Sequence, residues 1–436
     1  MNPQDLYAGI DVGTSGVRLY LIDAEAHLVY KARIPLPEGR RRGPRHEQNP
    51  EDWWKSLKAL LLSIPDQHAP RLRALSLDAT SGTLLLADDK GRPLGPALMY
   101  NDARATEEAE HIAHHAPRES GAHGASSSLA KLLWLLDNTD TSKARHALHQ
   151  ADWLLGRLAG RYGFSDENNC LKLGYDPIER HWPKWLTELP RVPSLLPMVH
   201  APGERVARID PDLARQLRLP ETLEICTGTT DSIAAFLATG ASKIGEAVTS
   251  LGSTLAIKIL AEQPIFAPEF GVYSHRLWEQ WLVGGASNSG GAVLLQYFTA
   301  EQMQELSDHL IPEMPSGLDF YPLPAPGERF PVADPDLPPR LEPRPDNDAR
   351  FFQGMLEGIA HIELRAYQKL QELGAPWPIS LRTVGGGSKN PAWTAIREKL
   401  LQIPFSTPAQ EQAAYGAALL ARRGIMNLES LSETPA

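Results

Sequence analysis

Residues 7–23 read YAGIDVGTSGVRLYLID, and this stretch decides the fold. Two apolar, β-branched runs at residues 7–12 and 17–22 are joined by DVGTSG, a glycine-rich turn with Asp11 at its mouth. The pattern predicts a β-hairpin. A turn of Gly, Thr and Ser exposes several backbone N–H groups and short hydroxyls at one point, which suits phosphate oxygens. For one such turn, an ordinary hairpin remains the alternative interpretation.

The same plan occurs a second time in the chain. Residues 247–260 read AVTSLGSTLAIKIL, again two apolar runs joined by a short turn of Gly, Ser and Thr. Finding the plan twice indicates two related halves and favours the phosphate interpretation, because two facing turns would clasp a polyphosphate. We therefore expect a boundary near Gly240, with one domain at residues 1–240 and a second at residues 241–436.

Strand and helix patterns alternate in both halves. Residues 49–64 have apolar residues at helical spacing after a cap at Asn49 or Asp52, and residues 348–373 predict a long helix. Strand, glycine-rich turn and helix follow one another at residues 281–298 and again at 381–393. This alternation predicts an α/β fold of two domains that face each other.

Composition limits the partners and the compartment. The chain has 436 residues and a net charge of −10, which gives no electrostatic footprint for nucleic acid or for an anionic membrane surface. It has two cysteines, and no segment reaches the roughly 20 apolar residues that a spanning helix needs. We expect a cytoplasmic protein that binds small molecules and neither nucleic acid nor membrane; the sequence leaves the oligomeric state open.

Asp231 lies where CTGTTD, residues 226–231, meets an alanine-rich helix. It could be the N-cap of that helix, a role worth about 1 kcal/mol. It could instead be a general base that accepts the proton of an attacking hydroxyl during phosphoryl transfer. Spacing alone does not choose between the two. No P-loop motif and no complete dinucleotide fingerprint of the form G-x-G-x-x-G occurs at the glycine-rich turns.

Nine segments in this order resemble the FGGY family of carbohydrate kinases. They are GIDVGTSGVRLYLID at residues 9–23, HEQNPEDWW at 46–54, YNDARA at 100–105, TGTTDSIAAF at 227–236, SLGSTLAIKI at 250–259, FYPLPAPGERFPV at 320–332, GMLEGIAHIELRAYQ at 354–368, GGGSKNPAW at 385–393 and AAYGAALLA at 413–421. The resemblance covers essentially the whole chain. It implies two ribonuclease-H-like domains of the actin and hexokinase type around an interdomain cleft, with ATP and Mg²⁺ as cofactors.

The resemblance also implies roles for residues. Asp231 would be the catalytic base, and Asp11 would orient Mg²⁺-ATP and approach the sugar. Thr14 and Ser15 would face the γ-phosphate. The remaining nucleotide-binding residues would be Gly252, Ser253, Thr254, Gly285, Gly386, Gly387, Ser388, Asn390 and Trp393.

The substrate segment departs from the better-known members. Where xylulose kinases have Met-His-Gly, this chain has Thr80, Ser81 and Gly82, and it has Thr229 and Thr230 before Asp231 in place of Gly-Gly. That pattern is similar to a compact D-ribulose kinase subgroup. The resemblance then implies that Ser81 and Ser232 offer hydroxyls to a ketopentose, with Asp102 as a further sugar-side or hinge residue.

The predicted reaction converts ATP and D-ribulose to ADP and D-ribulose 5-phosphate. Two alternatives stay open: a kinase for D-xylulose or another ketose or polyol, and an ATP-binding sensor of the same fold without catalysis.

Overall fold

The predicted hairpin forms from strands β1 (Leu6–Val12) and β2 (Gly16–Ile22) in the computed structural model, which describes residues 4–432. The strands pair antiparallel, with Tyr7 opposite Ile22, and the backbone N–H of Gly13 donates to the carbonyl of Gly16 at 3.0 Å across the turn. All seven residues of β1 are buried. The hairpin is therefore the interior of a sheet and is covered on both faces.

The first sheet has the strand order β12-β13-β6-β1-β2-β3, and β14 also pairs with β6. The further strands are β3 (Leu28–Pro35), β6 (Leu72–Ala79), β12 (Arg205–Arg208), β13 (Glu224–Cys226) and β14 (Thr229–Thr230). Strand β6 runs parallel to β1 and to β14. The carboxyl ends of these three strands therefore meet at one edge of the sheet.

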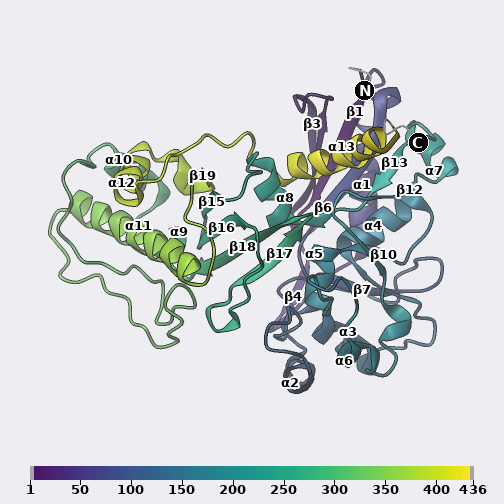
Figure 1. The fold of residues 1–436 in the computed structure, drawn as a ribbon, viewed down its shortest axis with the longest axis horizontal. Helices are drawn as coiled ribbons and strands as arrows, with labels where there is room; N and C mark the ends of the chain where they lie inside the picture. The colour runs from purple at the N-terminus through teal and green to yellow at the C-terminus, as the bar shows by residue number, and fades with distance from the viewer. Residues whose placement is uncertain (1–3, 433–436) are drawn as a thin grey trace. The chain divides into compact units, whose positions relative to one another are not determined.

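Helices cover this sheet (Figure 1). They are α1 (Pro50–Leu62), α4 (Gln150–Ala159), α7 (Pro211–Leu217), α8 (Asp231–Ala238) and α13 (Ala413–Ser432). Asn49 caps α1 by accepting from the backbone N–H of Glu51, so Asn49 and not Asp52 is the cap. Helix α13 packs against β1, β6 and α8. A Cβ atom at Gly9 would lie 2.0 Å from the carbonyl oxygen of Ala414, so the contact needs glycine there.

A smaller lobe of the same unit has its own sheet and core. The sheet order is β4-β5-β8-β7-β9. Its strands are β4 (Arg40–Arg42), β5 (Arg45–Gln48), β7 (Leu84–Ala87), β8 (Ala97–Leu98) and β9 (His146–His149). The remaining elements of the unit are α2 (Thr106–His115), α3 (Ser128–Asn138), α5 (Glu167–Cys170), α6 (Lys184–Thr187), a strand pair β10 (Phe164–Asp166) and β11 (Met198–His200), and the 3₁₀ turns η1 (Ala69–Arg71), η2 (Leu171–Leu173) and η3 (Pro193–Leu195).

The second unit repeats the hairpin plan of the first. Its sheet has the order β17-β18-β16-β15-β19, and β15 pairs antiparallel with β16 and parallel with β19. The strands are β15 (Glu246–Leu251), β16 (Leu255–Ala261), β17 (Tyr273–Leu277), β18 (Gln280–Ser287) and β19 (Ser380–Val384). The helices are α9 (Gly291–Leu294), α10 (Ala300–Ser307), α11 (Asp348–Glu372) and α12 (Pro391–Leu401), with 3₁₀ turns η4 (Pro268–Phe270) and η5 (Gly386–Lys389).

The division of the chain differs from the predicted one in its last segment. One compact unit comprises Met1–Ala238 together with Gln412–Ala436, and the other comprises Thr239–Glu411. The predicted boundary at residue 240 lies close to the first crossing. The prediction gave residues 412–436 to the second domain, but α13 packs on β1 in the first unit because small residues let the backbones approach closely.

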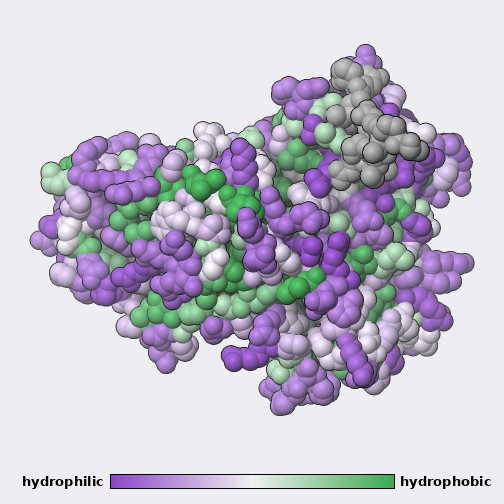
Figure 2. All heavy atoms as spheres, in the orientation of Figure 1, coloured by the Kyte–Doolittle hydropathy of each residue, from purple (hydrophilic) through white to green (hydrophobic). Residues whose placement is uncertain are grey.

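Polar side chains cover most of the face drawn in Figure 2, with hydrophobic areas between them. Among the described residues, no helix is both long enough and apolar enough to span a bilayer.

Candidate active site

Three carboxylates come together at the edge of the first sheet. Asp11 near the end of β1 lies opposite Asp78 of β6, and Asp78 lies opposite Thr229 of β14 on its other side. Asp231 begins α8 directly after β14. The structure thus places the predicted base and the predicted metal ligand in one unit, on neighbouring strand ends.

Asp11 is held by an ion pair. Its side chain is buried, and Nη1 of Arg18 donates to its Oδ2 at 2.7 Å. Burial raises the pKa of Asp11 above its ordinary value, and the charge of Arg18 opposes that rise. Asp11 is therefore oriented by a neighbour on β2 and keeps one carboxylate oxygen for other contacts.

Asp78 is the functional candidate that the sequence analysis missed. It is fully buried, and neither of its carboxylate oxygens accepts a hydrogen bond from an N–H or O–H group within residues 4–432. Burial raises the pKa of Asp78 well above its ordinary value, and the charges of Asp11 and Asp231 raise it further. The available signal was an aspartate inside the buried strand sequence LRALSLDA.

Asp231 is half-buried, and the backbone N–H of Ser232 donates to its Oδ1 at 2.6 Å. This contact belongs to the start of α8, so the structure shows the helix-terminal role, and the catalytic role of Asp231 stays a prediction. Ser232 itself is exposed. Both roles that the sequence left open thus remain compatible with the position of the carboxylate.

The loop at residues 80–83, which we name the sugar loop after its predicted role, is fixed from two sides. The hydroxyl of Thr80 contacts that of Thr83 at 2.6 Å and donates to Oε1 of Gln150 at 2.8 Å. Nζ of Lys131 donates to the carbonyl of Gly82 at 2.7 Å. Thr80 is thereby occupied, and Ser81 is the half-exposed hydroxyl of this loop.

Lys131 is buried without an acidic partner in contact. Its ammonium also donates to the carbonyl of Ser126 at 2.9 Å, so two backbone carbonyls bind it. Burial lowers the pKa of Lys131 to about 7, and the positive charge of Lys172 adds to this effect. Lys131 and Gln150 hold the sugar loop from α3 and α4.

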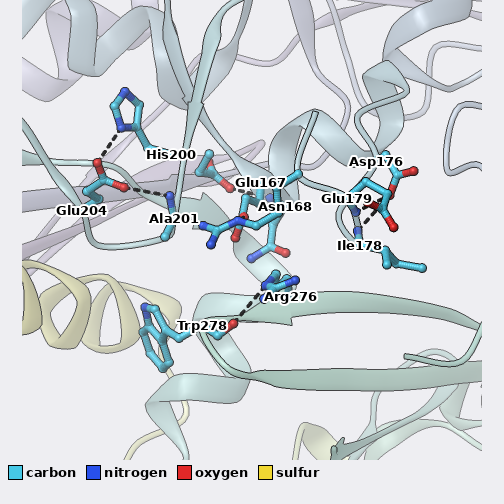
Figure 3. Close-up of polar contacts among 12 residues, drawn as sticks. Glu167, Asn168, Asp176, Ile178, Glu179, His200, Ala201, Glu204, Arg276 and Trp278 are labelled. Atoms are coloured by element: carbon cyan, nitrogen blue, oxygen red, sulfur yellow. Dashed lines mark hydrogen bonds and ion pairs between the residues drawn. The ribbon is translucent and has the colours of Figure 1, made fainter. Parts of the chain in front are cut away.

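The segment after β10 is tied to β14. Nδ2 of Asn168 donates to Oγ1 of Thr229 at 3.0 Å. Glu167 beside it accepts from Nε of Arg180 at 2.8 Å, and Figure 3 shows Glu167 and Asn168 side by side on α5. Further along, Asp176 accepts from the backbone N–H groups of Ile178 and Glu179 (Figure 3). These contacts fix the chain next to the strand that leads into Asp231.

Asp102 lies apart from the carboxylate cluster in its contacts. It is fully buried, and Arg104 donates to both of its oxygens, at 2.9 Å from Nε and 2.6 Å from Nη2. The backbone N–H of His46 donates to its Oδ2 at 2.6 Å. With both oxygens occupied, this arrangement favours a structural role over the predicted contact with sugar.

The first predicted phosphate turn is held through its backbone. Gln48 donates to the carbonyl of Thr14 at 3.0 Å, and the backbone N–H of Leu36 donates to the carbonyl of Ser15 at 3.0 Å. Thr14 is half-buried and Ser15 is exposed. Within the described chain, neither hydroxyl has a hydrogen-bond partner.

The second unit contains a pocket of about 530 Å³. Six predicted nucleotide-binding residues line it: Gly252, Ser253, Gly386, Gly387, Asn390 and Trp393. Its apolar wall, which the sequence analysis did not predict, includes Leu294, Leu295, Met303, Phe352 and Leu356. An apolar wall with a few polar groups suits a flat ring with polar substituents.

Short contacts shape this pocket. Carbonyls of Gly252 and Ser253 accept from the backbone N–H groups of Gly291 and Ala292, at 2.8 and 3.0 Å, which fixes the second predicted phosphate turn. Asn390 caps α12 by accepting from the backbone N–H of Trp393 at 3.0 Å.

Trp393 is a fixed part of the pocket wall. Its side chain is buried, and Nε1 donates to the carbonyl of Leu356 at 3.0 Å.

Three predicted residues do not line the pocket. Gly285 faces the core, since a Cβ atom there would lie 2.9 Å from the ring of Phe330. The hydroxyl of Ser388 donates to the carbonyl of Gly385 at 2.7 Å. Thr254 belongs to the turn between β15 and β16 but not to the pocket wall.

Comparisons with known proteins agree with this geometry. Residues 6–238 match the N-terminal domain, and residues 247–425 the C-terminal domain, of the FGGY family of carbohydrate kinases. A xylulose kinase of Escherichia coli (strain K12) is 24% identical, over 98% of this chain and 92% of the relative. A gluconokinase of Bacillus subtilis (strain 168) is 21% identical, over 94% and 86%.

Solved structures share the fold over nearly the whole chain. The crystal structure of a "xyloylose kinase" from Brucella ovis matches with a TM-score of 0.87 and 26% identity, over 97% of this chain and 91% of that one. Plasmodium falciparum glycerol kinase with ADP matches with a TM-score of 0.85 and 16% identity, over 98% and 91%. From the matches to both domain families, the chain belongs to the FGGY family of carbohydrate kinases and is an ATP-dependent sugar kinase.

Proposed function

We propose that this kinase phosphorylates the terminal hydroxyl of D-ribulose and releases D-ribulose 5-phosphate and ADP. The observation that carries the proposal is the sugar loop, where Ser81 presents a small hydroxyl while Thr80 and Gly82 are held by Gln150 and Lys131. The xylulose kinases that the sequence resembles have Met-His-Gly at this place. A different set of side chains there favours a different pentulose.

Asp231 acts as the general base in this proposal. Its carboxylate accepts the proton of the sugar hydroxyl while the hydroxyl oxygen forms a bond to the γ-phosphorus of ATP. The bond between that phosphorus and the bridging oxygen breaks, and ADP leaves with its electron pair. The half-buried position of Asp231 supports this role, because the Ser232 N–H fixes the carboxylate at the start of α8, beside Asp11 and Asp78.

The donor set fits Mg²⁺. Magnesium prefers carboxylate and water oxygens, and Asp11 supplies a carboxylate at the predicted position. The two oxygens of Asp78 next to it receive no hydrogen bond from residues 4–432, which is the condition of oxygens that serve a cation or its waters. When bound, the ion would neutralise charge on the phosphate oxygens.

We assign the adenosine part of ATP to the pocket of the second unit. The apolar wall would contact the base, and backbone groups of Gly386, Gly387 and the turn at Gly252 and Ser253 would contact ribose and phosphates. Thr14 and Ser15 of the first unit would face the γ-phosphate. Their hydroxyls, which bind nothing else in the described chain, support this role.

D-xylulose is the second candidate substrate, because several relatives are xylulose kinases. ADP production with Mg²⁺-ATP should be measured across D-ribulose, D-xylulose, L-ribulose, ribitol, xylitol and glycerol. The highest kcat/KM is expected for D-ribulose. A higher value for D-xylulose would overturn the D-ribulose assignment and keep the kinase, whereas ATP binding without turnover of any sugar would point to a sensor.

A further inference from the structure

Lys172 lies between two parts of the candidate site that were predicted to contact sugar, the sugar loop and the start of α8 at Asp231. It belongs to η2, directly after α5. A Cβ atom at Gly82 would lie 3.3 Å from Cδ of Lys172, so its aliphatic chain crosses the sugar loop next to Ser81. On the other side, Asn168 ties the same segment to Thr229, two residues before Asp231.

The ammonium of Lys172 makes no contact that accounts for its position. Among the described residues, no hydrogen bond or ion pair involves its Nζ. Burial lowers the pKa of Lys172, and the negative charge of Asp231 opposes this fall. Lys131 of the same site is fully buried and donates to two carbonyls, whereas Lys172 is partly exposed. Lys172 is therefore the lysine of this pair whose donors are available to a ligand.

The charges around Lys172 limit what that ligand can be. The edge of the sheet holds three carboxylates, Asp11, Asp78 and Asp231, and Arg18 already pairs with Asp11. A sugar acid would bring its negative charge beside Asp11 and Asp231, whereas a neutral sugar offers hydroxyl and carbonyl oxygens as acceptors.

We propose that Lys172 is a specificity-determining residue that donates a hydrogen bond to a hydroxyl or carbonyl oxygen of a neutral sugar bound between Ser81 and Asp231. This inference rests on the proposed sugar kinase function and deepens it by naming the donor and the charge class of the substrate. A lysine in this place has three donors and no acceptor, so it selects an oxygen lone pair.

Lys172→Met tests the assignment, because methionine keeps the packing over Gly82 and removes the donors. The KM for D-ribulose should rise about 10- to 100-fold, the size expected for losing a hydrogen bond to a charged donor. The KM for ATP should stay within about twofold, and the melting temperature should not fall, since no internal partner is lost. Lys184→Met is the matched control, because it removes the same charge from an exposed position on α6, where Lys184 forms a surface ion pair with Glu188.

Lys172→Gln provides a second variant in case the methionine variant does not fold. Its amide keeps two N–H donors and loses the charge, so a smaller rise in the sugar KM is expected. The assignment to Lys172 is overturned if either folded variant keeps the wild-type sugar KM while wild type turns over a sugar. The neutral-sugar part is overturned if wild type prefers D-gluconate over the ketopentoses. If wild type neither turns over nor binds any sugar, the proposed function fails, and the role of Lys172 fails with it.

Discussion

The turn after β1 and the turn after β15 have the same architecture and different chemistry. Each joins an antiparallel pair whose first strand also pairs with a parallel neighbour, β6 in one unit and β19 in the other. Asp11 and Asp78 lie opposite each other in the first unit, and Asp11 is two residues before Gly13 of the turn. At the matching register of the second unit are Ser250 and Val384.

The same hairpin plan therefore supports two different kinds of binding surface. In the first unit the strand ends bring together carboxylates: burial raises the pKa values of Asp11 and Asp78, and the charges of Asp11 and Asp231 raise the pKa of Asp78 further. In the second unit the corresponding edge adjoins a largely apolar pocket. Carboxylates that can accept a proton or bind a cation lie at the turn after β1, and an apolar pocket that can bind a flat ring adjoins the turn after β15.

The largest effect is expected from Asp231→Asn, which removes the proposed base beside Asp11 and Asp78. Turnover should fall about 100- to 10,000-fold, the usual contribution of a general base. ATP affinity, measured by isothermal titration calorimetry, should be unchanged because the pocket lies in the second unit. Asp212→Asn, at an exposed aspartate, is the control. A variant that keeps more than a few per cent of the wild-type rate would contradict the assignment of the base.

Two neighbouring glycines sharpen the assignment of the pocket. A Cβ atom at Gly387 would lie 2.5 Å from the ring of Trp393 and 2.7 Å from Cβ of Leu251, whereas one at Gly386 meets no protein atom within 4 Å. Gly387→Ala should therefore displace the pocket wall, destabilise the protein by about 1–3 kcal/mol and raise the KM for ATP about tenfold or more.

Gly386→Ala should retain wild-type stability. Steady-state kinetics and thermal unfolding of both variants check the contrast, with the sugar KM expected to stay unchanged. Equal effects of the two alanines on stability would contradict the packing described for Gly387.

The pH dependence of stability tests the burial and repulsion that raise the pKa of Asp78. Because the pKa of Asp78 is raised on folding, the native state binds more protons than the unfolded state between pH 3.8 and the raised value, so wild type loses stability as the pH rises through this window. Asp78→Asn should remove this loss and raise the free energy of unfolding at pH 7 to 8 in metal-free buffer. The gain should be on the order of 1.4 kcal/mol for each unit of pKa shift, and absent below the window.

Asp88→Asn should show the opposite sign. Burial acts to raise the pKa of Asp88, but hydrogen bonds from Arg92 and Lys90 outweigh it and leave the pKa lowered. Asp88 thus contributes stability at neutral pH that disappears as the pH falls through its folded pKa. Urea unfolding of both variants from pH 3 to 8 would test the pair; parallel curves for Asp78→Asn and wild type would contradict the proposed repulsion.

The smallest effect is expected at the cap of α12. Asn390→Ala removes the hydrogen bond to the N–H of Trp393 and a second one, at 2.8 Å, to the hydroxyl of Ser307. Stability should fall by about 1 kcal/mol. Asn390→Asp should keep the cap and most of the stability, so a similar loss in both variants would show that the cap is not the cause.

Local patterns predicted the parts of the fold that depend on neighbours in sequence. The two hairpins, the start of α8 at Asp231 and the long helix α11 all follow from turn residues, apolar spacing and caps within one segment. These features need few long-range contacts. The family resemblance added the positions of the turns that line the pocket.

The residues that sequence reasoning missed depend on distant partners. Asp78 gains its environment only when β6 pairs beside β1, and Lys172 only when η2 crosses Gly82. The family resemblance implied that Asp102 is a sugar-side or hinge residue. Its hydrogen bonds from Arg104 and from the N–H of His46 form in the folded protein and could not be read from the sequence. Burial and partner choice at such positions are properties of the tertiary structure.

The placement of α13 has a consequence for biosynthesis. Strand β1 leaves the ribosome long before the helix whose backbone rests against Gly9, because the whole second unit is synthesised between them. A nascent chain that lacks residues 413–425 exposes one apolar face of its first sheet, and domains otherwise tend to fold as they emerge. The first unit must therefore wait until the whole second unit has been synthesised, so a chain that stops at Glu411 contains both hairpins and still lacks the cover of its first sheet.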